Sequence, residues 1–406
     1  MGLKSLELIL QRAIDSVPPE LEKGAYTFEA WLLYRKPKIN AEAMKKLINE
    51  FKDNPELSIF DGKMRFFANF GNRLDYETLA KWLVFRGRLV GINEALDNLE
   101  KYLKEASYEI LEIKALGGIE IERSISLANN IELVPFSEIL DSYFKITLQT
   151  PRSGPGPFYG PSAALVRKIE QPKIHLNPEE LMEPIRTAID YGKELEIARL
   201  CLSLMNVAPV GFGSWLDMPD LVPCQQSSWG AYPHTIEVAK VRRIDQNDYE
   251  KSKEKHELFL KLSAEMQDRL KISLSRLNSA MNRHSNIDAA IDLGISLESL
   301  LMEEEEIGEF SFKLGLRAVK LLGENEQDRK RLDKIFKTLY DFRSKAVHLG
   351  RFLEKPRYEV HKVKITLEEG FRLTAKAIEK LMQLVIRKEL LEHKGKIKNW
   401  DHFLLK

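Results

Sequence analysis

The pattern of hydrophobic and polar positions divides the chain near residue 250. After that point apolar residues recur every three or four positions, as they do on one face of an α-helix. We therefore expect an all-α helical bundle in residues 251–406. The spacing predicts about five helices, over 257–283, 287–301, 311–322, 329–349 and 366–393.

The pattern in residues 1–250 is mixed and predicts an α+β region, so the whole chain is expected to be mainly α. Residues 1 to about 105 favour helices, and a hairpin is expected at Gly117-Gly118, where apolar and polar residues alternate. This region is expected to act as a sensor or regulator, in one unit or two subdomains. Further segments are predicted as strands at 143–150 and 164–176, a Pro/Gly-rich stretch at 151–162, helix at 177–206 and a long irregular loop at 210–235.

The long loop at 210–235 carries two tryptophans and is a candidate ligand or partner site. The simpler interpretation is a loop held in place by its own aromatic residues.

Composition narrows the function classes. The formal net charge is +1, so any site for a polyanion has to be a local patch. Cys201 and Cys224 are too few for a disulfide framework or a four-cysteine zinc site, and a reducing cytoplasm is the simplest location. No uncharged apolar run approaches the roughly 20 residues that span a bilayer, so no membrane association is expected.

The segment LYDFRSKAVHLG, at 339–350, holds the candidate chemistry. Arg343 and His348 lie five residues apart near the end of the expected helix, and Gly350 is placed to cap it. At 100° per residue they lie about 140° apart around the helix, at the two borders of a second apolar strip. So wide an apolar arc favours a partner surface, although Tyr340 and Val347 could equally meet another helix of the same bundle. The core stripe consists of Leu332, Ile335, Leu339, Phe342 and Ala346, and the second strip of Phe336, Tyr340 and Val347.

Spacing alone is weak support for a catalytic pair, because Arg387 and His393 satisfy a similar pattern by chance. The sequence has no motif for a metal site, a phosphate-binding loop or a nucleophilic serine. The histidines lack His-x3-His or Cys-x2-Cys partners, so neither a metal nor another cofactor is expected. No phosphate-binding glycine loop occurs, and Trp215 takes the place of the last glycine of a G-x-S-x-G turn.

The sequence motifs around this pair are more specific for a protein family than the spacing. RLNSAMNR, IDAAIDLGISLESLL, FSFKLGLRAVKLLG and LYDFRSKAVHLG follow one another between 276 and 350. In this order and spacing they resemble the Apea-like branch of the HEPN superfamily, with one leucine added before Gly350. The resemblance covers about a fifth of the chain at motif level and implies a HEPN helical bundle for residues 251–406.

The resemblance implies a metal-independent endoribonuclease that acts as a homodimer. Arg343 would contact the phosphate and His348 would transfer a proton. It also points to a cytoplasmic effector in defence against phage or to a toxin, with a phage-derived or cellular trigger acting on residues 1–250. Supporting roles are expected for Ser344, Lys345, Tyr340 and Glu298, and RNA binding for Arg351, although a surface position for Glu298 and a solvated helix end for Lys345 and Arg351 are the simpler interpretations.

The alternative function is a non-catalytic HEPN module, a dimerisation or nucleotide-binding adaptor. The intact Arg343 and His348 favour the enzyme, because an adaptor has no need of both. The N-terminal half could itself be an enzyme, but no catalytic constellation in it supports this.

Overall fold

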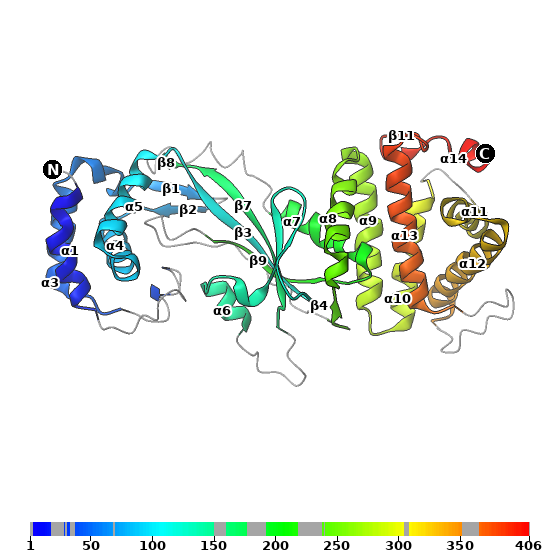
Figure 1. Cartoon of the computed structure of the whole chain (residues 1–406), viewed down its shortest axis with the longest axis horizontal. Helices are drawn as coiled ribbons and strands as arrows, with labels where there is room; N and C mark the ends of the chain where they lie inside the picture. Colours follow the sequence, from blue (N-terminus) through cyan, green and yellow to red (C-terminus); the bar gives the residue numbers. More distant parts are fainter. Residues whose placement is uncertain are drawn as a thin grey trace.

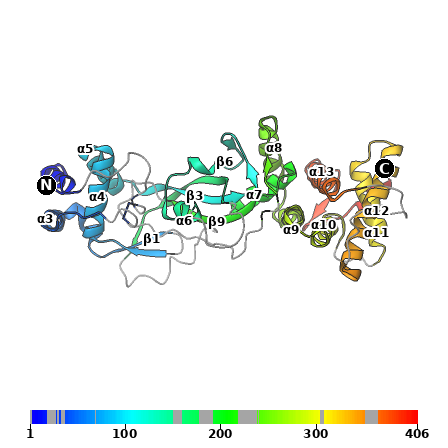
Figure 2. The same ribbon diagram turned by 90° about the horizontal axis from the view of Figure 1, so that it is seen from below.

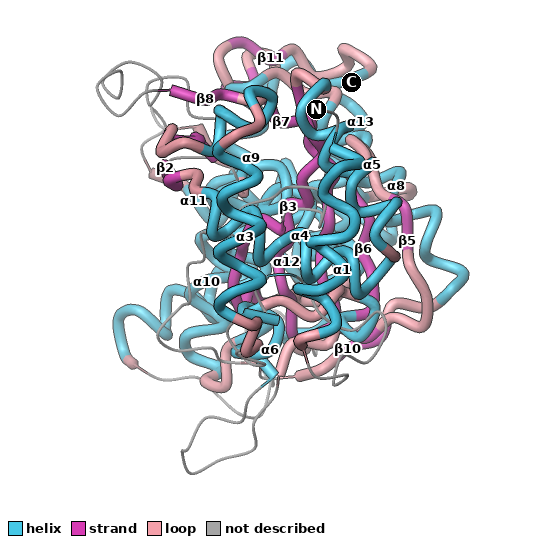
Figure 3. Tube along the Cα trace, turned by 90° about the vertical axis from the view of Figure 1, so that its left-hand side faces the viewer, coloured by secondary structure: helices cyan, strands magenta, loops and turns pink. Residues whose placement is uncertain are grey.

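The helices and strands follow one another along an elongated molecule, so that order in the sequence is also order in space (Figure 1). In this computed structural model the N-terminal helices, a central sheet and the C-terminal helices succeed each other, and the termini lie at opposite ends. Seen from the N-terminal end, the strands of the sheet lie behind the N-terminal helices (Figure 3). The structure describes residues 3–17, 28, 31–32, 37–67, 70–149, 160–176, 192–217, 238, 240–303, 308–350 and 365–405.

The N-terminal part is built around helix α4 (Tyr76–Val90), which is buried over most of its surface. Trp82 and Phe85 are fully buried in its hydrophobic core. Asp75 begins the helix, because its carboxylate accepts a hydrogen bond from the Thr78 N–H at 2.6 Å. The other helices of this part are η1 (Leu3–Leu6), α1 (Glu7–Asp15), α3 (Ala41–Lys52), η3 (Pro55–Phe60) and α5 (Ile92–Lys104).

The expectation of helices up to residue 105 missed a strand pair. Strand β1 (Met64–Phe67) pairs antiparallel with β2 (Phe70–Arg73) and with β8 (Ile174–Leu176), which lies far away in sequence. Each of these strands has at most four residues, so too few positions exist for an alternating pattern to emerge.

The central sheet has the order β5-β6-β7-β3-β9, and all of its paired strands are antiparallel. Strand β3 (Ser107–Gly117) carries Glu112, which is buried and paired with Arg167 of the neighbouring strand at 2.8 Å. A buried carboxylate needs such a partner, because desolvation disfavours its charge. The strands are β3 (Ser107–Gly117), β5 (Ile125–Ser126), β6 (Ile131–Pro135), β7 (Ala163–Pro172) and β9 (Val210–Asp217).

The hairpin predicted at Gly117-Gly118 does not form. Strand β3 already has β7 on one edge and β9 on the other, so no edge remains for the segment that follows it. After Gly118, which has a φ of 76°, the chain forms β4 (Ile119–Glu120). This short strand pairs in parallel with β10 (Arg242–Arg243).

Residues 143–150 were predicted as a strand but form helix α6 (Tyr143–Gln149) up to the last described position. The Ser142 hydroxyl accepts a hydrogen bond from the Lys145 N–H at 3.3 Å, as a residue at a helix start does. Phe144 and Leu148 are four residues apart and both buried, and Phe144 stacks on Trp215. Packing against the sheet therefore overrides the strand-like alternation.

The irregular loop predicted from residue 210 begins instead with strand β9. Its glycines indicated a break, but the Phe212 ring lies directly over Gly117 of β3, where a Cβ atom would come within 2.2 Å of it. The remainder of that loop, from 218 to 235, lies outside the described residues, as do most of the stretch 151–162 and the segment 177–191.

The C-terminal part is a bundle in which helices predominate, as expected. The helix predicted over 257–283 is in fact two, because the chain turns before Ser263, whose hydroxyl accepts a hydrogen bond from the Met266 N–H at 3.2 Å. The last long helix ends at Ile386 and not at 393. The helices are α8 (Tyr249–Leu260), α9 (Ala264–Asn282), α10 (Asn286–Leu301), α11 (Phe310–Leu322), α12 (Glu326–Leu349), α13 (Leu367–Ile386) and α14 (Trp400–Leu405). A strand pair, β11 (Glu392–His393) and β12 (Lys396–Ile397), lies between α13 and α14 in the sequence.

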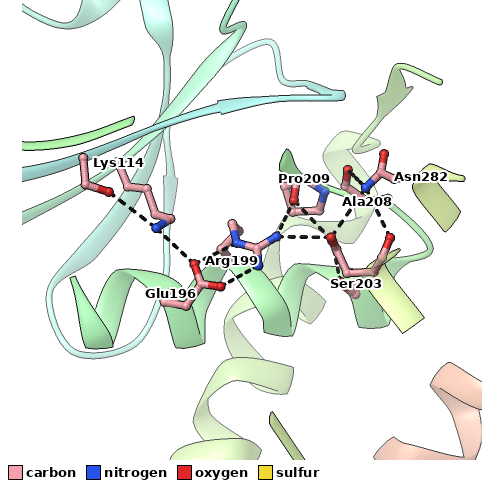
Figure 4. Close-up of polar contacts among 9 residues, drawn as sticks. Lys114, Glu196, Arg199, Ser203, Ala208, Pro209 and Asn282 are labelled. Atoms are coloured by element: carbon pink, nitrogen blue, oxygen red, sulfur yellow. Dashed lines mark hydrogen bonds and ion pairs between the residues drawn. The ribbon is translucent and has the colours of Figure 1, made fainter. Parts of the chain in front are cut away.

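A polar network connects the sheet to this bundle (Figure 4). Lys114 on β3 forms an ion pair with Glu196 at 3.0 Å, and Glu196 in turn pairs with Arg199 at 2.5 Å. Both lie on helix α7 (Lys193–Cys201). The Arg199 guanidinium donates to the Pro209 carbonyl at 2.6 Å and to Asn278 on α9 at 3.2 Å.

The same joint is sealed by amide side chains of α9. Asn278 donates to the Ser203 hydroxyl at 3.1 Å, and Asn282 donates to the Ala208 carbonyl at 3.0 Å. All of these polar side chains are buried, so breaking one bond leaves a desolvated group without its partner. The joint therefore resists bending.

The hydrophobic core of the bundle extends across residue 250. Ile197, Leu200 and Leu204, from α7 and the adjoining η7 (Leu202–Met205), lie in the same cluster as the side chains of α9 and α13. A division into 1–250 and 251–406 stays a prediction. Among the described helices, none is long and apolar enough to cross a membrane.

The buried His256 on α8 predicts a pH-dependent stability. Both ring nitrogens are buried and lack a hydrogen-bond partner among the described residues, and burial lowers the pKa of His256 to about 4. Since the unfolded chain protonates this ring near pH 6.5, its stabilising contribution is complete above that pH and falls as the pH drops toward 4. At pH 5 the loss is about 2 kcal/mol.

Thermal unfolding at pH 7.5 and pH 5 measures this effect. His256→Leu should show a smaller difference in Tm between the two pH values than the unmodified chain. An equal difference in both proteins would contradict the assignment.

Candidate active site

Helix α12 ends where the sequence predicts. Gly350 adopts a left-handed conformation with a φ of 57°, and its N–H donates to the Ala346 carbonyl at 3.2 Å. Glycine suits this position because it has no Cβ atom to strain there. The leucine before Gly350 extends the helix to Leu349 and leaves the glycine cap in place.

The core stripe of α12 is confirmed, because all five of its predicted residues are buried. The residues of the second apolar strip differ in burial. Phe336 is fully buried in the same core and Tyr340 packs against that core half-buried, so these two meet their own bundle. Val347 is 48% exposed and Leu349 61% exposed. The apolar surface left open on this helix is thus confined to its last turn.

Arg343 lies flat against helix α10, where the two helices approach closely. A Cβ atom added to Gly294 would come within 2.3 Å of the Arg343 Cγ and 2.6 Å of its Cβ. The missing side chain at Gly294 therefore makes room for the arginine. Sequence reasoning overlooked this residue, although a glycine inside a helical pattern was a signal that something packs against it.

Glu298, one turn further along α10, pairs with the guanidinium. Its carboxylate lies 3.4 Å from the Arg343 Nη2 atom, at the long end of a hydrogen bond. The surface position favoured from the sequence is wrong, since 24% of the Glu298 side chain is exposed. Arg343 Nε is buried and has no hydrogen-bond partner within the described ranges. The Glu298 contact at the Nη2 atom therefore orients the guanidinium from the side of α10.

The electrostatics of this cluster follow from its partial burial. Desolvation raises the pKa of Glu298, and the Arg343 charge partly offsets that rise. Burial likewise raises the pKa of Tyr340, and the neighbouring Glu298 carboxylate adds to the effect. The structure thus brings together three of the predicted site residues, Arg343, Glu298 and Tyr340.

The other predicted site residues are arranged differently. Ser344 and Lys345 are half-buried on α12, while His348 is exposed in its last turn. Figure 2 shows this end of α12 projecting beyond α10, on the side away from α13. No hydrogen bond or ion pair of the described residues joins His348 to Arg343, and Arg351 lies outside those residues. One chain therefore presents the two residues of the pair on different sides of a projecting helix.

The described residues form no candidate metal site, and the second Arg–His match lies elsewhere. Within the described part of the chain, no three histidine, cysteine or acidic side chains gather closely enough to hold a metal ion. His393, the chance match to the spacing, lies in strand β11 at the far end of α13. Comparison with models of protein families, with curated proteins and with solved structures finds no match for this chain.

The close approach at Gly294 predicts a stability effect. Alanine usually stabilises a helix by about 1 kcal/mol relative to glycine, but overpacking at tight contacts costs about 1–3 kcal/mol. At position 294 the obstructing atoms are the Arg343 Cβ and Cγ, which cannot move without α12. Gly294→Ala should therefore lower the Tm in thermal unfolding.

Gly315 provides the matched control, because it also lies inside a helix. A Cβ atom added there would have the Asp333 Oδ1 atom as its nearest neighbour, at 3.2 Å. That atom ends a flexible side chain, so Gly315→Ala should leave the Tm unchanged or raise it. A Gly294→Ala protein as stable as Gly315→Ala would contradict the close approach.

Proposed function

We propose that this chain is a metal-independent endoribonuclease of the HEPN type, with Arg343 and His348 as its catalytic pair. The observation that carries the proposal is the arrangement at the end of α12. An arginine is oriented by a half-buried carboxylate at 3.4 Å, and an exposed histidine follows it five residues later. The four motifs that resemble the HEPN superfamily lie on α9, α10, α11 and α12, and two of these helices, α10 and α12, carry the residues of the site.

The proposed chemistry needs little from the protein. RNA supplies its own nucleophile, the 2′-OH, which attacks the adjacent phosphorus while the bond to the 5′-oxygen breaks. His348 accepts the proton of the 2′-OH and passes a proton to the departing 5′-oxygen, and Arg343 stabilises the charge on the phosphorus oxygens with its planar guanidinium. Glu298 is a positioning residue, which acts through Arg343. The products carry 2′,3′-cyclic phosphate and 5′-OH ends.

A second copy of the chain completes the site in this proposal. Arg343 lies against α10, whereas His348 points from the projecting turn, about 140° away around the helix. Two copies related by a twofold axis would form two shared centres, each with Arg343 from one copy and His348 from the other. The exposed Val347 and Leu349 lie in the same turn and would be covered by such an interface.

The biological role proposed is that of a cytoplasmic effector in defence against phage or of a toxin. A free ribonuclease harms its own cell, so residues 1–250 are proposed to restrain or direct the site in response to a phage-derived or cellular trigger. The buried joint in Figure 4 supports this division of labour, because it ties the sheet to helix α9.

A non-catalytic adaptor is the second candidate. The observation that favours it is that no described contact joins Arg343 to His348 within one chain, while the last turn of α12 exposes apolar residues suited to dimerisation. Activity and assembly distinguish the two candidates.

The enzyme proposal predicts RNA cleavage that persists in excess EDTA, because no metal takes part. DNA lacks the 2′-OH and should stay intact. His348→Ala should lose roughly 10²–10⁴-fold in rate, the usual contribution of positioned acid–base catalysis. Arg343→Lys should also be impaired, since an ammonium group cannot replace the guanidinium fork. Gel assays of a labelled RNA and of DNA with the same base sequence, with mapping of the product ends, measure all four outcomes.

His393→Ala is the control for the histidine, because His393 is exposed and lies in strand β11. It should keep full activity. Cleavage that stops with EDTA and returns with magnesium would contradict the mechanism, and loss in His393→Ala but not in His348→Ala would show that the pair is wrong.

The assembly proposal predicts a mass of twice 46.9 kDa at micromolar concentration in light scattering. Val347→Glu places a charge in the exposed turn and should yield an inactive monomer, because burying an unpaired charge in an interface is unfavourable. Leu391→Glu, at a similarly exposed leucine (52%), should remain a dimer. An unmodified chain that is a monomer and cleaves RNA would contradict the shared site.

A further inference from the structure

A cavity opens between strand β10 and the helical bundle, away from the last turn of α12. Its volume is about 460 Å³, within the range of pockets that enclose small molecules. One wall comes from the segment that leads into β10, with Lys240 and Arg242. The other comes from the turn between α9 and α10 and from the start of α13. Ligand sites are common at such joints between parts of a chain.

The wall of this cavity is positively charged. Lys240, Arg242 and Arg283 line it together with His284, and Glu368 is the carboxylate of the lining. With His284 neutral the lining carries a net charge of +2, although the chain as a whole carries +1. The cationic groups are therefore concentrated here, and although the buried Asp292 offsets part of the Arg283 charge, the wall favours an anion.

Ion pairs hold two of the cationic side chains in place. Arg242 donates to both oxygens of Glu368 at 2.9 and 3.0 Å and to the Asn206 carbonyl at 2.7 Å. Arg283 donates to the buried Asp292 at 2.8 Å. Lys240 is looser, at 3.8 Å from Glu368, with 64% of its side chain exposed. Fixed arginines with an adjustable lysine form a prepared surface for an anion.

Backbone and apolar groups complete the cavity. Asn286 and Leu367 stand in the first turns of α10 and α13, where N–H groups have no partner within the helix. These N–H groups add to the attraction for an anion that the side chains create. Met281, Ile365 and Phe371 line the remainder of the cavity, so part of any ligand has to be apolar.

We infer that this cavity binds a small phosphate monoester with a planar or apolar body, of about the size of a nucleoside monophosphate. The phosphate would meet Lys240, Arg283 and His284, and the body would lie on Met281 and Phe371. The site goes beyond the proposed ribonuclease centre and uses none of its residues. Because strand β10 and the bundle both line it, a bound ligand holds that strand against the bundle.

Thermal unfolding and calorimetry of the full chain test this inference with four probes: AMP, adenosine, ribose 5-phosphate and inorganic phosphate. AMP should raise the Tm with concentration, as a ligand of the folded state does. Adenosine lacks the phosphate and the other two lack an apolar body, so each should bind at least tenfold more weakly than AMP. Binding is read directly, so the result does not depend on RNA cleavage.

Lys240→Glu/His284→Glu places two negative charges at the two most adjustable positions of the cavity and should weaken AMP binding at least tenfold. Both side chains are exposed and without a close ion pair among the described residues, so folding should be unaffected. Lys52→Glu/His402→Glu makes the same substitutions at the two ends of the molecule and should bind AMP normally. Absence of AMP binding, equal binding of adenosine, equal binding of free phosphate or ribose 5-phosphate, or unchanged AMP binding in Lys240→Glu/His284→Glu would each overturn the inference.

Discussion

The close approach of α10 and α12 at Gly294 is the constraint on which the candidate active site depends. Because Gly294 has no side chain, Arg343 lies flat on α10 and its guanidinium reaches Glu298. This contact fixes half of the pair, while His348 stands exposed in a turn that projects from the bundle. In the proposed function, a second chain supplies the other half of the pair.

The same helices connect the site to the rest of the molecule. Asn278 and Asn282 of α9 bind the loop that follows α7, which is held in turn by the sheet. Further along α9, the Ser273 hydroxyl donates to the Ser296 carbonyl of α10 at 2.9 Å, inside the core. A series of polar contacts therefore runs from the sheet through α9 to α10, the helix that supports Arg343, and its last link is buried. The cationic cavity lies beside this series, at the end of α9.

The sequence predicts what depends on local periodicity and local chemistry. The core stripe of α12 and the cap at Gly350 belong to this class, because both follow from spacing along one helix. Prediction from the sequence fails where contacts with distant segments determine the secondary structure. Residues 143–149 form a helix because Phe144 packs on Trp215, and β3 has no free edge for a hairpin because strands from distant segments occupy both. Spacing along α12 draws attention to Arg343 and His348. The packing of Arg343 on α10 could not be predicted, because it depends on a contact between two helices.

Mixing two inactive variants tests most directly whether Arg343 and His348 act together across two copies. Equal amounts of Arg343→Ala and His348→Ala proteins, allowed to exchange subunits, form mixed dimers in which one of the two shared centres has both residues. RNA cleavage should return to roughly a quarter of the unmodified rate, because random exchange places half of the chains in mixed dimers and each such dimer has one intact centre. Cleavage that stays absent in the mixture, while the unmodified chain cleaves RNA, would contradict a centre shared between two copies.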